Sequence, residues 1–161
     1  MGTGKSGRYL NTQGSGRSVS DFALVHSSEG TFTYDSRTGM VSRLKSGGHG
    51  QNGIDLLNRQ GLKYNIVKTF PNGVRIGNVP NHKKDWKRSG TGQVWFPKTW
   101  KEKDIRRAGE HVAGLKSNRH KPDGITVFGT YRGVRVGVIK TNGKIATVFP
   151  DMNQPLRNRR K

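Results

Sequence analysis

The stretch ITVFGTYRGVRVGVIKTNGKIATVF, residues 125–149, carries the strongest structural signal in the chain. It contains three runs rich in β-branched residues, separated by Arg132-Gly133 and by Asn142-Gly143. The Asn-Gly pair favours a type I′ turn, because both residues tolerate the positive φ angles that this turn requires. The pattern predicts a three-stranded antiparallel meander with strands at Ile125–Tyr131, Val134–Lys140 and Ile145–Phe149.

Upstream of the meander, helical and extended patterns alternate. Thr99 and Glu102 have the spacing of a capping box, which predicts the start of a helix that ends near Gly114. The other expected elements are a short helix at 52–61 and two strands at Tyr64–Phe70 and Val74–Val79. Together they predict a compact α+β domain, in which the N-terminal helices pack on an antiparallel sheet that ends in the meander.

Composition divides the chain into three parts. Residues 1–45 are rich in Gly, Ser, Thr and Arg and have no sustained periodicity, so we expect a linker or a weakly ordered segment. Residues 46–152 contain all the predicted elements and form the expected domain. Residues 153–161 have the composition of a basic tail.

The charge of the chain points to a polyanionic partner. Lys and Arg number 30 against 10 Asp and Glu, which gives a net charge of +20. Nucleic acid is the favoured partner, because Lys and Arg release condensed counterions from its phosphates. Membrane insertion is not expected, since the sequence has neither an apolar run of about 18 residues nor a basic amphipathic helix.

The residue types available restrict the chemistry. The chain has no cysteine, which excludes disulfides and thiolate metal sites. Acidic residues are few and scattered, and no His-Glu-x-x-His pattern occurs. The sequence therefore offers few ligands for the metal ions of a metal-dependent nuclease. We therefore expect no metal and no other cofactor.

The remaining candidates for catalytic groups are histidines surrounded by positive charge. RNA cleavage without a metal needs few groups besides these. A base removes the proton of the ribose 2′-hydroxyl, an acid protonates the departing 5′-oxygen, and a cation stabilises the phosphate. Two imidazoles can fill both roles because their pKa lies near neutrality. DNA lacks the 2′-hydroxyl and is not a substrate for this route.

Of the five histidines, His82 has the best local signature of a phosphate site. It lies in a basic loop, and the alternative is a solvated charge run with an incidental histidine. The neighbouring cations expected to bind substrate are Lys83, Lys84, Lys87 and Arg88.

His49 lies in the segment Gly-Gly-His-Gly, where glycines let the backbone approach a ligand closely. The alternative is the end of a flexible linker. The remaining histidines are weaker candidates, because they fall in the loose N-terminal part, in a helix and in a surface loop: His26, His111 and His120.

From Ser46 to Asp151 the chain resembles the bacterial EndoU-type nuclease domains found at the C-termini of polymorphic toxins. The resemblance rests on GQVWFPKTW at 92–100, before the second helix, and on GKIATVFP at 143–150. The family pairs a "Phe-Pro, two residues, Trp" segment with a terminal "Thr-x-Tyr-Pro" strand. The resemblance implies a fold shared with barnase-like and colicin-type RNases, and metal-independent cleavage to a 2′,3′-cyclic phosphate.

The resemblance also implies a site of two upstream histidines and a hydroxyl in the last strand. Carried over, His82 takes one histidine position, Thr147 the hydroxyl position, and Phe149 the position where Tyr is usual. Phe149 can stack on a base but cannot donate a hydrogen bond. His49 is the candidate for the other histidine, although it lies 33 residues before His82. The alternatives that could complete the pair are Tyr64 and Lys68.

Arg75 and Trp95 complete the expected substrate-binding set. Trp95 has two interpretations: exposed, it is a stacking platform for an unpaired base; buried, it anchors the helix on the sheet.

The sequence therefore predicts a monomeric toxin endoribonuclease, secreted or delivered into the cytoplasm of a target bacterium as the C-terminal part of a larger toxin. An acidic cognate immunity protein is the expected partner besides RNA. Two alternatives stay open: a non-catalytic basic module that binds RNA or DNA, and a metal-dependent DNase toxin.

Overall fold

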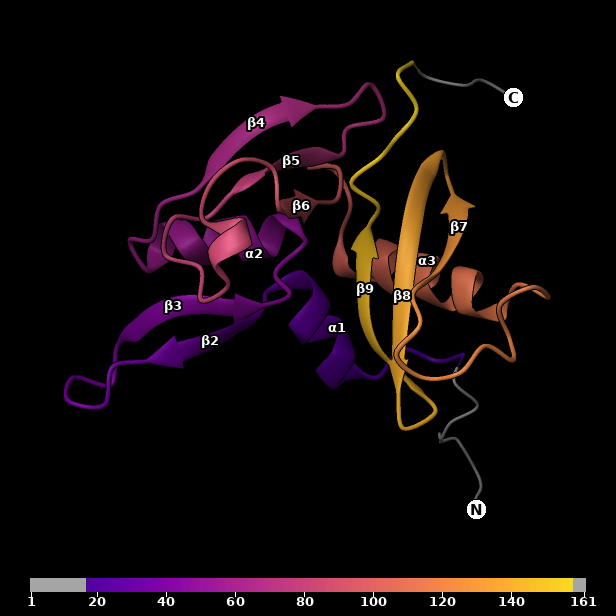
Figure 1. Ribbon diagram of the computed structural model, residues 1–161, viewed down its shortest axis with the longest axis horizontal. Helices are drawn as coiled ribbons and strands as arrows, with labels where there is room; N and C mark the ends of the chain where they lie inside the picture. Colours follow the sequence, from indigo (N-terminus) through magenta and orange to yellow (C-terminus); the bar gives the residue numbers. More distant parts are fainter. Residues whose placement is uncertain (1–16, 158–161) are drawn as a thin grey trace.

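The C-terminal meander is present in the computed structural model, which describes residues 17–157 (Figure 1). Its strands are β7 (Val127–Tyr131), β8 (Val134–Thr141) and β9 (Lys144–Pro150), paired antiparallel in that order. Both turns have positive φ at both central residues: 51° and 80° at Arg132 and Gly133, and 53° and 75° at Asn142 and Gly143. These angles are those of type I′ turns, so the predicted turn chemistry is confirmed.

Two smaller antiparallel sheets precede the meander. One has the order β4-β5-β6, and the other is a hairpin of β2 and β3. The strand bounds are Thr31–Tyr34 for β2, Val41–Ser46 for β3, Asn65–Thr69 for β4, Arg75–Asn78 for β5 and Gln93–Trp95 for β6. The β4-β5 pair was predicted; β6 was not, because three residues are too few to show a period. A 3-10 turn, η1 (Asp85–Lys87), lies in the loop between β5 and β6.

Three helices accompany the sheets in the described residues: α1 (Asp21–Ser28), α2 (Gln51–Arg59) and α3 (Glu102–Gly114). The last two were predicted, and the α+β class is confirmed. The start of α3 differs in detail, because the Asp104 carboxylate accepts from the backbone N–H of Lys101 at 2.8 Å. Lys101 is thus the cap residue, and the expected pairing of Thr99 with Glu102 does not form.

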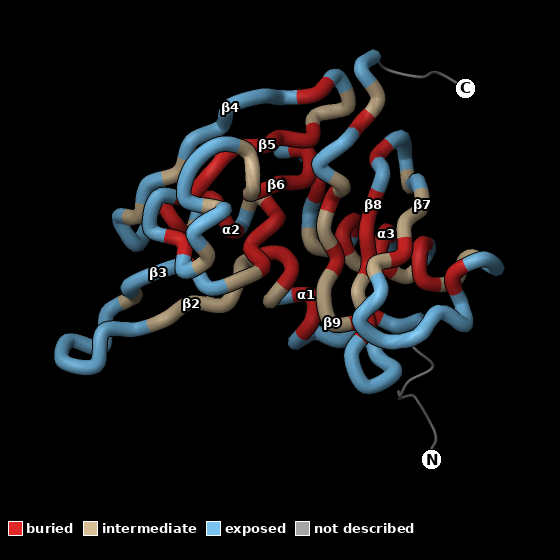
Figure 2. The backbone as a smooth tube through the Cα atoms, viewed as in Figure 1, coloured by how far each residue is buried: buried red, intermediate tan, exposed pale blue. Residues whose placement is uncertain are grey.

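The fold has two hydrophobic cores. In the larger core, α1 and α3 pack against the meander, where Figure 2 shows buried backbone along α3 and β8. The smaller core lies between α2, β3 and β6, and its buried members are Leu44, Ile54, Leu57, Val79 and Trp95. No helix in residues 17–157 is both long enough and apolar enough to cross a membrane.

The N-terminal part differs from the linker-like segment expected at residues 1–45. Residues 21–46 form α1 and the β2-β3 hairpin, and Ser20 Oγ caps α1 by accepting from Ala23 N at 3.1 Å. Val19 is buried, and its N–H donates to Glu110 on α3 at 3.0 Å. Order here comes from contacts with distant residues, which composition does not reveal. Residues 1–16 of that segment, and 158–161 of the expected basic tail, lie outside the described residues.

Candidate active site

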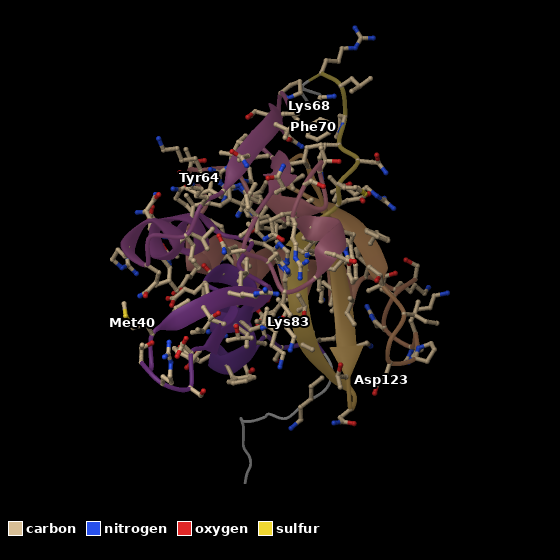
Figure 3. All side chains as sticks on the ribbon, turned by 60° about the vertical axis from the view of Figure 1, so that its left-hand side comes forward. Met40, Tyr64, Lys68, Phe70, Lys83 and Asp123 are labelled. Carbon is tan, nitrogen blue, oxygen red and sulfur yellow. The ribbon has the colours of Figure 1, made fainter. Side chains whose placement is uncertain are left out.

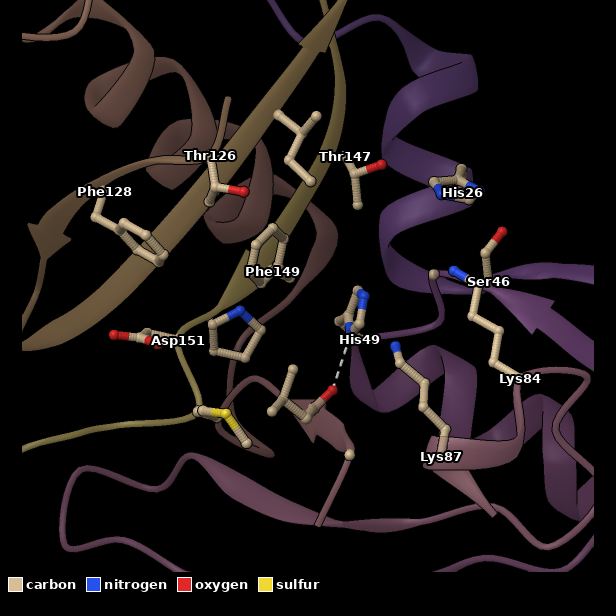
Figure 4. A pocket seen from close by; sticks show the side chains of 16 residues that line it. His26, Ser46, His49, Lys84, Lys87, Thr126, Phe128, Thr147, Phe149 and Asp151 are labelled. Carbon is tan, nitrogen blue, oxygen red and sulfur yellow. Dashed lines mark hydrogen bonds between the residues drawn. The ribbon is translucent and has the colours of Figure 1, made fainter. Parts of the chain in front are cut away.

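A cavity of about 430 Å³ opens between the N-terminal elements and the meander (Figure 4). Its walls come from α1, the end of β3, the loop that contains η1, and the strands of the meander. Most of the side chains that could take part in catalysis line this cavity. The polar side chains that line the cavity include His26, Ser46, His49, Lys84, Lys87, Thr126 and Thr147.

The segment 47–50, which we call the glycine loop, joins α1 to this cavity through its backbone. The last carbonyls of a helix have no partner within the helix. Here three carbonyls at the end of α1 accept hydrogen bonds from three consecutive N–H groups of the loop. The pairs are Gly48 to His26 at 3.0 Å, His49 to Ser27 at 2.6 Å, and Gly50 to Ser28 at 3.0 Å.

Glycine is required at the start of this loop. Gly47 and Gly48 have φ angles of +72° and +74°, which side chains rarely adopt. A Cβ on Gly47 would also lie 2.1 Å from the carbonyl oxygen of His26. The two glycines therefore allow the chain to pass against α1 and bring His49 beside His26.

His49 has a defined tautomer. The side chain is 4% exposed, and Nδ1 donates to the Val94 carbonyl at 2.8 Å. Because a carbonyl only accepts, Nδ1 carries the hydrogen, and in the neutral ring Nε2 is an acceptor. Burial, together with the positive charge of Lys87, lowers the pKa of His49 to about 3. His49 is therefore neutral at neutral pH and can accept a proton at Nε2.

His26 lies on the last turn of α1, on the same cavity. Its ring is half-buried, and Nδ1 lies 2.7 Å from the Thr31 hydroxyl oxygen. Burial lowers its pKa below the usual 6.5, and the charges of Lys84 and Lys87 lower it further. His26 was a weak candidate from the sequence, because residues 1–45 were expected to be a linker or a weakly ordered segment.

Lys87 extends from η1 toward His49 (Figure 4). Its Nζ donates to Gln93 Oε1 at 3.1 Å, and the fully buried Gln93 in turn donates to the Gly47 carbonyl at 3.2 Å. One amide thus fixes both the lysine and the glycine loop. Burial and the nearby Lys84 lower the pKa of Lys87 to about 8, so the amine is still charged at neutral pH.

Thr147 and Phe149 reach the cavity from β9, as the resemblance implied. Val148 between them packs in the larger core, so the alternation of the strand turns its neighbours toward the cavity. The N–H of Val148 donates to Ser27 Oγ at 2.9 Å, which holds β9 against α1. The ring of Phe149 lies 5.9 Å from that of His49, measured between centroids.

The structure does not bring His82 into the cavity. Its ring is 0% exposed, its Nδ1 accepts from the backbone N–H of Lys84 at 2.9 Å, and its Nε2 has no hydrogen-bond partner. Burial and the cations Lys87, Lys84 and Arg88 lower its pKa to about 4. The basic loop folds over its own histidine, so the local signature of a phosphate site does not correspond to an accessible imidazole.

The other expected residues are also dispersed. Trp95 is fully buried, with its ring edge-on to Tyr64 at 6.2 Å, so it anchors the smaller core and cannot stack on a base. Arg75 lies outside the cavity and donates to Gln51 Oε1 at 2.7 Å and to the Phe96 carbonyl at 2.5 Å.

Of the predicted cations, only Lys84 and Lys87 line the cavity, whereas Lys83 and Arg88 line a neighbouring hollow. Tyr64 and Lys68, the alternative partners for a histidine, lie beside and on β4 and do not reach the cavity (Figure 3). Among residues 17–157, no three His, Asp or Glu side chains gather in a way that could hold a metal ion.

Comparison with known proteins gives one family. The family model described as "Bacterial EndoU nuclease" matches residues 20–152, a span that includes α1 and the glycine loop. No curated protein and no solved structure gave a significant match. The match covers most of the chain, and the chain belongs to the bacterial EndoU nuclease family.

Proposed function

We propose that this nuclease cleaves RNA without a metal, by attack of a ribose 2′-hydroxyl on the adjacent phosphate. The bond from O2′ to phosphorus forms as the bond from phosphorus to O5′ breaks, leaving a 2′,3′-cyclic phosphate and a 5′-hydroxyl. The observation that carries the proposal is the gathering of two imidazoles, a half-buried ammonium and a hydroxyl around one cavity: His26, His49, Lys87 and Thr147.

His49 is the general base in this proposal. Its hydrogen bond to Val94 leaves Nε2 as the proton acceptor, and burial keeps the ring uncharged at neutral pH. The approach of an anionic phosphate favours the protonated ring and so raises the basicity of His49 when substrate binds. His49 then takes the proton of the 2′-hydroxyl.

His26 is the general acid, which protonates O5′ as it leaves. It lies across the cavity from His49 and is less buried, so it can exchange protons with solvent between turnovers. Lys87 and Thr147 are proposed to hold the phosphate oxygens. A charged amine and a hydroxyl donor both stabilise the negative charge that grows on the phosphate in the transition state.

This set of groups favours RNA over DNA as the substrate. Two imidazoles and an amine can move protons and stabilise charge, and the 2′-hydroxyl of RNA is a nucleophile already in place. The net charge of +20 supports binding to a polyanion of either kind. The chemistry of the cavity, and not the charge, therefore supports the choice of RNA.

A DNA oligonucleotide that contains a single ribose tests the proposal in the presence of excess EDTA. We expect one cut, on the 3′ side of the ribose, and a product that ends in a 2′,3′-cyclic phosphate. His49→Ala and His26→Ala should each remove this cut, whereas His120→Ala, at an exposed histidine outside the cavity, should not. Cleavage of all-DNA strands that needs Mg²⁺ would instead support a metal-dependent DNase.

The biological setting is also a proposal: a toxin domain that a cognate acidic protein inhibits. Its support is the resemblance to toxin nuclease domains together with the charge, since complementary potentials speed the encounter of two proteins. An inhibitor that covers the cavity would compete with RNA. Its association should slow as salt rises, and a complex that leaves the cavity open would contradict direct blocking.

A further inference from the structure

One tryptophan lies on the surface of the protein. Trp86, in η1, is 64% exposed, whereas Trp95 and Trp100 are 0% and 8% exposed. Tryptophan is enriched at binding surfaces, because its ring offers a large apolar contact area and a polar N–H group. The placement of Trp86 is not explained by either core, since it belongs to neither.

The surroundings of Trp86 are strongly basic. It lines a hollow of about 480 Å³ together with Lys45, Lys83, Lys84, Asp85 and Arg88. The amine of Lys84 lies over the Trp86 ring, 5.7 Å from its centroid. An exposed aromatic plane beside several cations is the arrangement that binds single-stranded nucleic acid, with bases on the ring and phosphates on the cations.

The backbone under this ring is held in place. Arg88 donates from Nε to the His82 carbonyl at 2.8 Å and from its terminal nitrogen to the Lys83 carbonyl at 3.0 Å. The buried ring of His82 accepts from the N–H of Lys84. The tryptophan is therefore presented by a fixed turn, so little ordering of the backbone is required on binding.

The hollow adjoins the cavity of the active site. Lys84 lines both, and Lys87, which lines the cavity, belongs to the same 3-10 turn as Trp86. A strand whose phosphate lies between His26 and His49 would therefore pass directly onto this basic surface.

We infer that Trp86 is a stacking platform for the base of a nucleotide next to the cleaved linkage of single-stranded RNA. Lys83, Lys84 and Arg88 bind the phosphates on either side of that base. This inference rests on the proposed function, because it takes the scissile phosphate to lie in the cavity. It assigns to the enzyme a preference for unpaired RNA, since a paired base must first be unstacked and unpaired before it can meet the ring.

Binding of a single-stranded 2′-fluoro RNA, which has no nucleophile, tests the inference without cleavage. Trp86→Ala should raise the Kd by about 5- to 150-fold, the range for stacking one base on an aromatic side chain. Trp86→Phe should restore most of the affinity. Tyr34→Ala is the matched control, because Tyr34 is also 64% exposed but lines neither the cavity nor the hollow.

An oligonucleotide of equal length with abasic sites separates stacking from charge. It keeps the phosphates but has no bases, so Trp86→Ala should bind it as tightly as the wild type does. The fluorescence of the wild type should fall when 2′-fluoro RNA binds, and Trp86→Phe should lose this change, because Trp95 and Trp100 are buried.

Wild-type affinity of Trp86→Ala for 2′-fluoro RNA would overturn the inference and leave the proposed cleavage untouched. An equal loss of affinity for the abasic strand would also overturn it, because the ring would then act through the phosphates. If the protein cuts no RNA but Trp86→Ala still weakens binding to bases, the proposed function fails and the platform stands.

Discussion

The glycine loop at 47–50 and the basic loop at 82–88 each hold one buried histidine, and the two rings have opposite tautomers. His49 donates from Nδ1 and has its acceptor nitrogen available at the cavity. His82 accepts at Nδ1, and its Nε2–H is enclosed without a partner. The backbone of the glycine loop bonds to the end of α1, whereas the basic loop bonds to its own carbonyls and to Leu44 on β3. Backbone partners, and not the local density of charge, thus decide which imidazole can meet a substrate.

The largest expected effect separates the two histidines. His49→Ala should lower kcat for RNA cleavage by at least about 100-fold, the scale for removing a positioned acid or base. His82→Asn should stay within a few-fold of the wild type, because the Asn oxygen can still accept from the N–H of Lys84. Single-turnover kinetics measure both. Equal losses would mean that His82 takes part in the reaction, and the contrast between the loops would fail.

A pair of glycines tests how the glycine loop positions His49. Gly47 and Gly39 both have φ of +72°, but a Cβ on Gly39 meets nothing within 4 Å, whereas one on Gly47 meets the His26 carbonyl oxygen. Gly47→Ala should lower kcat by roughly 10- to 100-fold, because small displacements of reacting groups are costly. Gly39→Ala should leave kcat unchanged and cost only about 1 kcal/mol of stability. Equal kcat values for the two variants would show that the close approach to α1 is unimportant.

The pH dependence of kcat/KM tests the roles of the two cavity histidines. A base must be deprotonated, so activity falls as pH drops through the pKa of His49, about 3 in the free enzyme. An acid must be protonated, so activity falls as pH rises through the pKa of His26, which is lowered below 6.5. We therefore expect a bell-shaped profile with both limbs on the acid side of 6.5. An alkaline limb that His26→Ala leaves in place would assign the acid to another group.

The smallest expected effect concerns the pH dependence of stability, to which His82 contributes together with His49, whose pKa is also lowered. The pKa of His82 is about 4 in the fold and near 6.5 when unfolded, so the unfolded chain binds the proton more readily. The buried neutral ring of His82 contributes fully to the free energy of unfolding above pH 6.5. This contribution is lost as pH falls toward 4, by up to about 1.4 kcal/mol per pH unit. His82→Asn should flatten this dependence in chemical denaturation between pH 6.5 and 4, whereas His120→Ala should not. An unchanged slope in His82→Asn would mean that another group titrates.

The parts of the fold that could be predicted from the sequence are those with local causes. The type I′ turns at Asn142-Gly143 and Arg132-Gly133 set the meander, and the periodicity of α2 and α3 is long enough to show. By contrast, α1 has eight residues and little periodicity, and its order depends on partners such as Val148 and Glu110. His26 was disfavoured for that reason.

Exposure was the other quantity that the sequence did not reveal. Trp95 was placed in the substrate-binding set, with burial as the alternative interpretation, and it is buried in β6, whereas Trp86, nine residues earlier in a charged loop, is the exposed ring. Trp86 stands among charged residues, whereas Trp95 is flanked by Val94 and Phe96 and lies on β6, which pairs with β5. Thr147 and Phe149 were assigned to the site by the family resemblance, and both line the cavity because residues two apart on a strand face the same side.

The hydrogen bond from Val148 to Ser27 joins residues 121 positions apart. The cavity has walls from both ends of the domain, so it is incomplete until β9 has emerged from the ribosome and docked on α1. A chain that is cut or arrested before β9 therefore lacks one wall of the cavity, including Thr147 and Phe149.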